Sequence, residues 1–113
     1  MLPPIILSIA GSDCSGGAGI QADIKTISAL GGYAASVITA VTAQNTLGVQ
    51  SVYPIPVDMV KAQITSVMDD LRPDAVKIGM VYDAGIVTTI VDCLQTYTPE
   101  CIVLSLIHIS EPT

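Results

Sequence analysis

Basic side chains are scarce in this sequence of 113 residues, which has ten acidic residues, four basic ones and a formal net charge of −6. The four are Lys25, Lys61, Arg72 and Lys77, and they are scattered along the chain. No basic patch or stripe of the kind that binds nucleic acid is formed, so we expect no nucleic-acid partner. Acidity of this size mainly favours solubility.

Histidine and cysteine are also rare. The single histidine is His108, and the three cysteines are Cys14, Cys93 and Cys101. One histidine supports neither a catalytic triad nor a His-based metal site. An odd number of cysteines without C-x-x-C spacing argues against a disulfide framework or a zinc site. We therefore assign no catalytic residue and no metal ligand within this chain.

Long apolar runs are absent as well. No stretch reaches the length of about 18 residues that a membrane-spanning helix needs. The N-terminus also lacks the basic start and the cleavage site of a signal peptide. We therefore expect a cytoplasmic protein without a membrane partner. Half of the residues are apolar and 12% are charged, which excludes disorder and suggests strands buried on both faces.

Strand-like and helix-like segments alternate along the chain. Strands are expected at residues 5–9, 33–42, 49–53, 75–78 and 101–104, the third being half-buried. Three apolar stripes at helical spacing predict helices, the last one capped by Asp83. The stripes are Ile20, Ile24, Ile27 and Leu30; Val57, Val60, Ile64, Val67, Met68 and Leu71; and Ile86, Val87, Ile90, Val91 and Leu94. This order predicts an α/β fold with a mostly parallel sheet and helices on both faces.

Three polar or glycine-rich stretches follow strands of this sheet. They are AGSDCSGGAGIQAD (10–23), the segment 42–46 and the pair Gly79-Met80. Ligands of parallel α/β sheets bind beyond the carboxyl ends of the strands, so the three stretches are expected to converge on one site. A glycine-rich loop that opens into a helix often holds an anion or a small polar ligand.

Asp23 and Gln44 are the residues of these stretches most suited to bind a ligand. Asp23 falls inside the apolar stripe of its helix, where an unpaired acid is costly, so it meets either a partner or a cavity. A role in favouring the positive end of the helix stays open. The amide of Gln44 both donates and accepts, which suits the edge of a heterocycle, although a role in the turn is also open. A core role is the default for Met80.

Familiar motifs do not identify the ligand. A Walker A loop fails because Gly19 is followed by Ile20-Gln21 instead of Lys-Ser/Thr. Gly17-x-Gly19-x-x-Ala22 fits the dinucleotide-binding fingerprint only loosely. The Gly-x-Ser-x-Gly pattern of serine hydrolases is absent.

Taken in order and spacing, AGSDCSGGAGIQAD, SVITAVTAQNTLGVQSV and DAVKIGM resemble the hydroxymethylpyrimidine/phosphomethylpyrimidine kinases of thiamine biosynthesis, which belong to the ribokinase-like superfamily. Cys14 stands where this family commonly has serine. The resemblance implies a three-layer ribokinase-like fold, truncated here. It also implies phosphorylation, with ATP and Mg²⁺, of 4-amino-5-hydroxymethyl-2-methylpyrimidine and then of its monophosphate. Pyridoxal/pyridoxine-type kinase activity, or non-catalytic pyrimidine binding by the fragment, are the alternatives.

The same resemblance assigns roles to four residues. Gln44 would hydrogen-bond the pyrimidine, Asp23 and the Gly11 backbone would line the pocket, and Met80 would pack on the ring. The family's Gly-Thr-Gly anion hole, its catalytic residue and most of its ATP site would lie in a C-terminal half beyond this chain. We also expect the complete protein to be a homodimer.

The match to the family runs through residue 104, so residues 1–104 are read as the N-terminal part of a kinase domain. The family typically continues with Asp-Pro-Val-Met, but this chain continues with Ser105 and the residues LIHISEPT. Residues 105–113 are therefore predicted to be a non-family tail that resembles translated cloning adapter. Truncation is expected to leave one side of the sheet unpaired and apolar surface uncovered.

Overall fold

The computed structural model describes residues 2–81 and 83–105 of the chain. Five strands and three helices follow one another in the order β1 (Ile5–Asp13), α1 (Gly19–Ala29), β2 (Tyr33–Asn45), β3 (Gly48–Pro54), α2 (Val57–Asp70), β4 (Ala75–Ile78), α3 (Ala84–Tyr97) and β5 (Ile102–Leu104). The strands form one sheet in the order β3-β2-β1-β4-β5. All neighbours are parallel except β2 and β3, which form an antiparallel hairpin.

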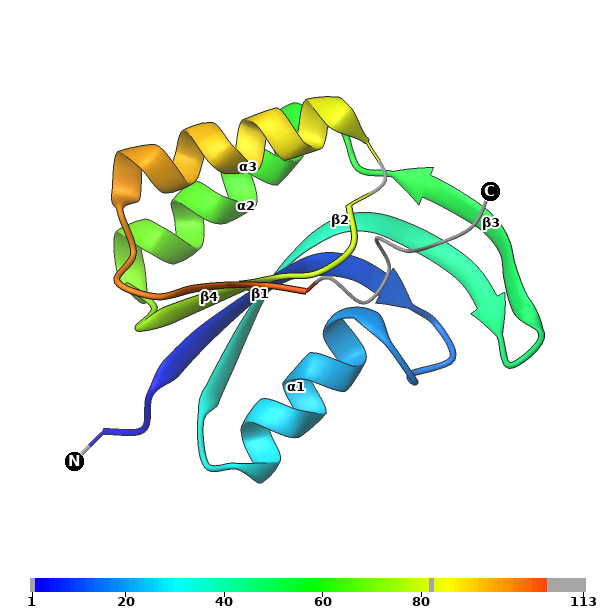
Figure 1. Ribbon diagram of the computed structural model, residues 1–113, viewed down its shortest axis with the longest axis horizontal. Coiled ribbons are helices and arrows are strands. Elements are labelled where there is room, and N and C mark those ends of the chain that lie inside the picture. The colour runs from blue at the N-terminus through cyan, green and yellow to red at the C-terminus, as the bar shows by residue number, and fades with distance from the viewer. Residues whose placement is uncertain (1, 82, 106–113) are drawn as a thin grey trace.

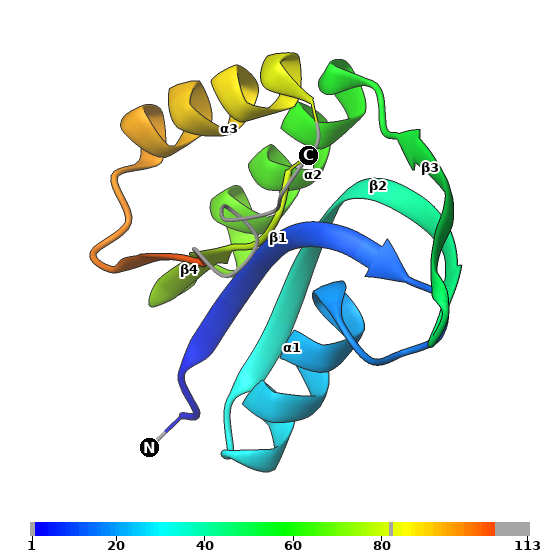
Figure 2. The ribbon, with the colours of Figure 1, turned by 45° about the vertical axis from the view of Figure 1, so that its right-hand side comes forward.

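Helices cover both faces of the sheet, which gives three layers. Helix α1 lies on one face, and α2 and α3 lie side by side on the other (Figure 1). The same arrangement is seen after a turn of the molecule (Figure 2). The expected parallel α/β architecture with helices on both faces is therefore confirmed.

The two faces differ in polarity because side chains alternate along each strand. In β1, Leu7 and Ile9 are fully buried and belong to the apolar core that β1, β2 and β4 form with α2 and α3. Ser8 lies on the opposite face and donates a hydrogen bond to a side chain of α1. The α1 face of the central strand is thus partly polar, although it is buried.

The sequence placed the ends of two long strands and several apolar side chains wrongly. Strand β2 runs to Asn45, not Thr42. Strand β1 runs to Asp13, not Ile9, so the glycine-rich loop is only five residues long, Cys14–Ala18. Leu30 is 83% exposed because it lies just beyond the end of α1.

The outward face of α3 was also predicted incorrectly. Val87 and Val91 are 44% and 46% exposed, whereas Cys93, which was not predicted to be in the core, is buried there. The buried stripe is Ile86, Ile90, Cys93 and Leu94, and Val87 and Val91 lie just beyond its Leu94 edge around the helix. The predicted cap is confirmed, because the Asp83 carboxylate accepts from the backbone N–H groups of Gly85 and Ile86.

The two outer strands are exposed. Strand β3 is not half-buried as expected: only Val52 is partly covered, because the β2–β3 hairpin extends beyond the helices (Figure 1). At the other edge, Ile102, Val103 and Leu104 of β5 are 49–57% exposed. An apolar edge strand of this kind is a surface on which another strand can pair. No helix among residues 2–81 and 83–105 is long and apolar enough to cross a membrane.

Helix α1 packs directly on the end of β1 through a glycine. Gly19, its first residue, has a φ of +60°, and a Cβ built on it would overlap the carbonyl oxygen of Gly11. A Cβ on Gly17 would instead meet only the Asp13 carboxylate, at an ordinary 3.8 Å. The start of α1 is therefore tied to β1 at a distance that only glycine allows.

Gly19→Ala is expected to lower the free energy of unfolding by at least about 1–2 kcal/mol, because alanine disfavours left-handed backbone and its methyl group would collide with β1. The matched control is Gly17→Ala, which should change it by no more than about 0.5 kcal/mol. Urea unfolding followed by circular dichroism measures both. Equal effects of the two substitutions would contradict this account of the α1–β1 contact.

Candidate functional site

A cavity of about 420 Å³ opens at the carboxyl edge of the sheet. We call it the carboxyl-edge pocket; its lining residues are Ala10, Gly11, Ser12, Asp13, Ala18, Gly19, Asp23, Thr42, Gln44, Val49, Lys77, Gly79, Met80 and Ser105. All of them except Val49, Lys77 and Ser105 come from the three stretches that the sequence predicts to converge, and each stretch contributes. A volume of this size is suited to a small molecule.

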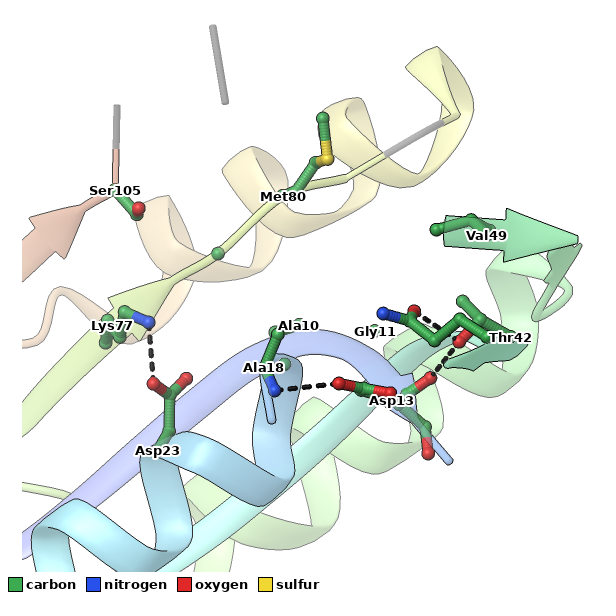
Figure 3. Close-up of a pocket in the computed structure, with 14 residues that line it drawn as sticks. Ala10, Gly11, Asp13, Ala18, Asp23, Thr42, Val49, Lys77, Met80 and Ser105 are labelled. Carbon is green, nitrogen blue, oxygen red and sulfur yellow. Dashed lines mark hydrogen bonds and ion pairs between the residues drawn. The ribbon is translucent and has the colours of Figure 1, made fainter. Parts of the chain in front are cut away.

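All four residues expected to bind substrate line this pocket. Gly11 is at the end of β1, Asp23 is on α1, Gln44 is near the end of β2, and Met80 follows β4. Met80 and Val49 lie on the side of the pocket away from α1, and Asp23 projects from α1 (Figure 3). The structure thus brings the four together, while their contacts with a ligand remain a prediction.

The glycine-rich loop wraps around the carboxylate of Asp13, which is 3% exposed. One oxygen, Oδ1, accepts from the backbone N–H of Ser15 at 2.8 Å and from its hydroxyl at 2.6 Å. The other, Oδ2, accepts from the N–H groups of Gly17 and Ala18 at 3.0 and 2.8 Å. The amides of the loop therefore already hold an anion, and that anion is a side chain of the protein.

These hydrogen bonds lower the pKa of Asp13 from its usual value of 3.8. The largest cause is the Ser15 hydroxyl; burial acts in the opposite direction, and the backbone N–H groups of Ser15, Ala18 and Gly17 lower the pKa further. The carboxylate is consequently ionised at neutral pH. Its charge also lies beside the positive N-terminal end of α1, which no side chain of the capping residue Ala18 satisfies.

Asp23 has two partners as well as a cavity. Its Oδ1 lies 2.7 Å from the Lys77 ammonium of β4 (Figure 3). Its Oδ2 accepts from the Ser8 hydroxyl at 2.7 Å. The Asp23 side chain is 15% exposed and the Lys77 side chain 34% exposed. The ion pair joins α1 to the centre of the sheet at the wall of the pocket, which explains how an acid is tolerated inside an apolar stripe.

Gln44 is held through both its backbone and its side chain. Its backbone N–H donates to Sγ of Cys14 at 3.3 Å, and its carbonyl lies 3.2 Å from the same sulfur. Its side-chain amide contacts the Thr42 hydroxyl at 2.7 Å. Cys14, 30 residues away in sequence, thus ties the glycine-rich loop to the end of β2.

Sequence reasoning missed three lining residues that organise the pocket. Asp13 precedes Ser15 and Gly16-Gly17, a spacing typical of a carboxylate that bonds the backbone of its own loop. Lys77 is the one charged residue of a short apolar strand, and a charge in such a strand indicates a nearby group of opposite charge. Thr42, 6% exposed, carries no comparable signal.

The described residues do not form a metal site. In residues 2–81 and 83–105, no group of three or more His, Cys, Asp or Glu side chains lies close enough together to hold a metal ion. Asp13 and Asp23 both use their oxygens for bonds within the protein. Neither carboxylate is therefore suited to hold Mg²⁺ in this arrangement.

Solved structures show the same fold. A crystal structure of phosphomethylpyrimidine kinase from Clostridium difficile superposes with a TM-score of 0.91 at 52% identity, over 96% of this chain and 47% of that one. A Bacillus subtilis pyridoxal kinase, solved as an ADP complex, gives a TM-score of 0.88 at 31% identity over 98% of this chain and 42% of that one. The fold is therefore that of the ribokinase-like vitamin kinases, as expected.

Sequence comparison agrees and is more specific. The family model described as phosphomethylpyrimidine kinase matches residues 13–111. The hydroxymethylpyrimidine/phosphomethylpyrimidine kinase of Escherichia coli is 54% identical over 105 residues. The chain belongs to the phosphomethylpyrimidine kinase family. It covers 40% of the length of the E. coli enzyme, with 93% of its own length in the match.

The boundary proposed between residues 104 and 105 stays a prediction. The family match extends to residue 111, and all of the proposed tail except Ser105 lies outside the described residues, His108 included. Ser105 itself donates its backbone N–H to the carbonyl of Ile78, so it continues the pairing of β5 with β4.

Asp13→Asn is expected to lower the midpoint of thermal unfolding at neutral pH, because a neutral amide replaces the charge that the loop surrounds. The folded-state pKa of Asp13 lies below its usual value, so the stabilisation is fully present above pH 3.8. It is lost as the pH falls through the folded-state pKa. Thermal unfolding from pH 7 to pH 2 should therefore show wild type and variant converging at the acidic end.

The control for that substitution is Asp92→Asn, which changes an exposed aspartate of α3. This variant should follow the wild-type curve at every pH. A constant gap between wild type and Asp13→Asn down to pH 2 would mean that the charge of Asp13 does not hold the loop.

Lys77→Met is expected to destabilise the chain by about 1–2 kcal/mol, since it leaves a mostly buried carboxylate with one partner; the exposure of Lys77 keeps the value below that of fully buried pairs. In a double-mutant cycle with Asp23→Asn, the coupling energy should be about 1 kcal/mol. Urea unfolding of the four proteins measures it. Simple additivity would show that the ion pair contributes nothing to stability.

Proposed function

We propose that this chain forms the pyrimidine-binding part of a kinase that phosphorylates 4-amino-5-hydroxymethyl-2-methylpyrimidine and its monophosphate in thiamine biosynthesis. The observation that carries the proposal is the meeting of Gly11, Asp23, Gln44 and Met80 around one cavity of small-molecule size. Membership of the family and 54% identity to the E. coli enzyme support the same substrate.

The residues of the pocket suit the parts of such a ring. Met80 and Val49 supply apolar walls for its faces, and Asp23 and Gln44 supply polar atoms for its edge. A mostly apolar cavity with a few convergent polar groups is the usual form of a small-molecule site. In this proposal, binding and orienting the pyrimidine are the tasks of this part of the enzyme.

Phosphoryl transfer needs more than a pyrimidine pocket. It depends on positioning the phosphoryl group and stabilising its charge. We infer that ATP and Mg²⁺ are held mostly by the C-terminal part that the longer relatives have, together with the catalytic residue and the anion hole. We further infer a cytoplasmic homodimer for the complete protein, from the family resemblance alone.

A pyridoxal/pyridoxine-type kinase is the second candidate. The likeness to the B. subtilis pyridoxal kinase supports it, because both substrates are substituted six-membered heterocycles with a hydroxymethyl group. The higher identity to the pyrimidine kinases favours the first candidate. Pyrimidine binding without turnover is the third possibility for the chain by itself.

The test uses a completed chain, in which residues 1–104 are joined to the C-terminal part of the E. coli kinase. We expect ATP consumption with the pyrimidine to exceed that with pyridoxine. Gln44→Ala and Asp23→Asn should each raise the KM for the pyrimidine about 10-fold, the value of one lost hydrogen bond of about 1.4 kcal/mol. The matched control is Gln50→Ala, which removes an exposed glutamine of β3 that bonds the Gly48 carbonyl outside the pocket.

Faster turnover of pyridoxine would replace the first candidate by the second. If the folded completed chain binds the pyrimidine but consumes no ATP, the third possibility holds. An unchanged KM in both Gln44→Ala and Asp23→Asn would mean that the substrate does not bind in the carboxyl-edge pocket.

A further inference from the structure

The hydroxyl of Thr42 lies between two oxygen-bearing groups at the wall of the carboxyl-edge pocket. Its Oγ1 is 2.7 Å from the backbone carbonyl oxygen of Ser12 and 2.7 Å from the side-chain amide of Gln44, whose oxygen Oε1 is the atom placed toward it, so one hydroxyl hydrogen faces two acceptors. The Thr42 residue is 6% exposed, so bulk water replaces neither partner. Figure 3 shows the hydroxyl beside the end of β1, where these groups meet.

Counting hydrogens settles the direction of both contacts. A threonine hydroxyl carries one hydrogen, and a carbonyl oxygen can only accept, so the hydrogen of Thr42 points to Ser12. The Gln44 group at 2.7 Å must then donate to Oγ1, because two oxygens at that distance without a hydrogen between them repel each other. The oxygen and nitrogen of a glutamine amide are assigned by such partners, so the hydrogen count requires the amide to be turned over, with its NH₂ group in place of Oε1 beside Thr42.

The orientation of the Gln44 amide decides which of its atoms a ligand meets. With Nε2 turned to Thr42, Oε1 is the atom left to face the pocket. Asp23, also on the pocket wall, offers only carboxylate oxygens, two of whose lone-pair sites are used by Lys77 and Ser8. Gln44 and Asp23 thus both present acceptors to the pocket.

The backbone of Gln44 is fixed at the same time. Cys14 bonds its N–H and its carbonyl, and the pairing of β2 with β3 is irregular between Ala43 and Gln44. Irregularities of this kind aim a side chain in a particular direction. The side-chain torsions of Gln44 are then left, and the contact with the Thr42 hydroxyl restrains the amide at their end.

We propose that Thr42 is a positioning residue that makes the pocket selective for a ring bearing an N–H donor, by holding the Gln44 amide with its oxygen toward the ligand. This inference rests on the proposed function for the identity of the ring, whose exocyclic amino group is the matching donor. The orientation of Gln44 is independent of the proposed function, because it is a property of the protein without ligand.

The orientation is measured directly by NMR on the completed chain, without substrate. We expect nuclear Overhauser effects between the Gln44 side-chain NH₂ protons and the methyl group of Thr42. Their absence, with the NH₂ protons instead close to pocket residues such as Met80, would overturn the proposal. This result stands whether or not the completed chain phosphorylates the pyrimidine.

The selectivity is measured with two substrates, the 4-amino pyrimidine and its 4-deamino analogue 5-hydroxymethyl-2-methylpyrimidine. In the wild-type completed chain, kcat/KM should favour the amino compound by about 10-fold or more, because the analogue leaves Oε1 without a donor. Thr42→Val frees the amide to turn and donate to a ring nitrogen, so the preference should fall toward parity, mainly through KM. Thr42→Ser keeps the hydroxyl and should retain the wild-type preference.

Each outcome bears on one claim. A wild-type enzyme without preference, or a Thr42→Val variant with the full wild-type preference, would overturn the role of Thr42. If Thr42→Val does not fold, the NMR contact and the wild-type preference decide. If the wild-type completed chain accepts neither pyrimidine, the proposed function fails, and the orientation of Gln44 is still decided by NMR.

Discussion

The pocket depends on one buried charge, the carboxylate of Asp13. Three backbone N–H groups and one hydroxyl of the loop after β1 point at it, so the loop has a single compact conformation around an anion that the chain itself provides. The backbone groups at the start of α1 are thereby used inside the protein. A loop that resembles a phosphate cradle in sequence acts here as the frame of the carboxyl-edge pocket.

The other contacts build on this frame. Because the loop places α1 against β1, Asp23 meets Ser8 on β1 and Lys77 on β4, and the three polar residues join a helix and two strands. Through Cys14 the same loop reaches the backbone of Gln44 on β2. Loop, helix and strands therefore set the positions of the side chains that are proposed to meet the substrate.

Hydrophobic periodicity predicted the helices and most of the strands, because burial against the sheet is what selects these positions. It failed for Leu30, Val57, Val87 and Val91, which are 44–83% exposed, since a pattern in sequence does not say which flank of a stripe a neighbouring element covers. The convergence of Asp23 and Gln44 followed from the rule for parallel sheets. Lys77 as the partner of Asp23 did not, because 54 residues separate them and only the register of β1 with β4 brings them together.

The central claim is that the carboxyl-edge pocket binds the pyrimidine. Titrating 4-amino-5-hydroxymethyl-2-methylpyrimidine into the ¹⁵N-labelled completed chain, and recording backbone amide shifts, tests it most directly. We predict that the largest changes fall on Gly11, Ala18, Gln44 and Met80. Largest changes at the opposite edge of the sheet, around Asp74 and Thr98, where a second cavity lies, would contradict it.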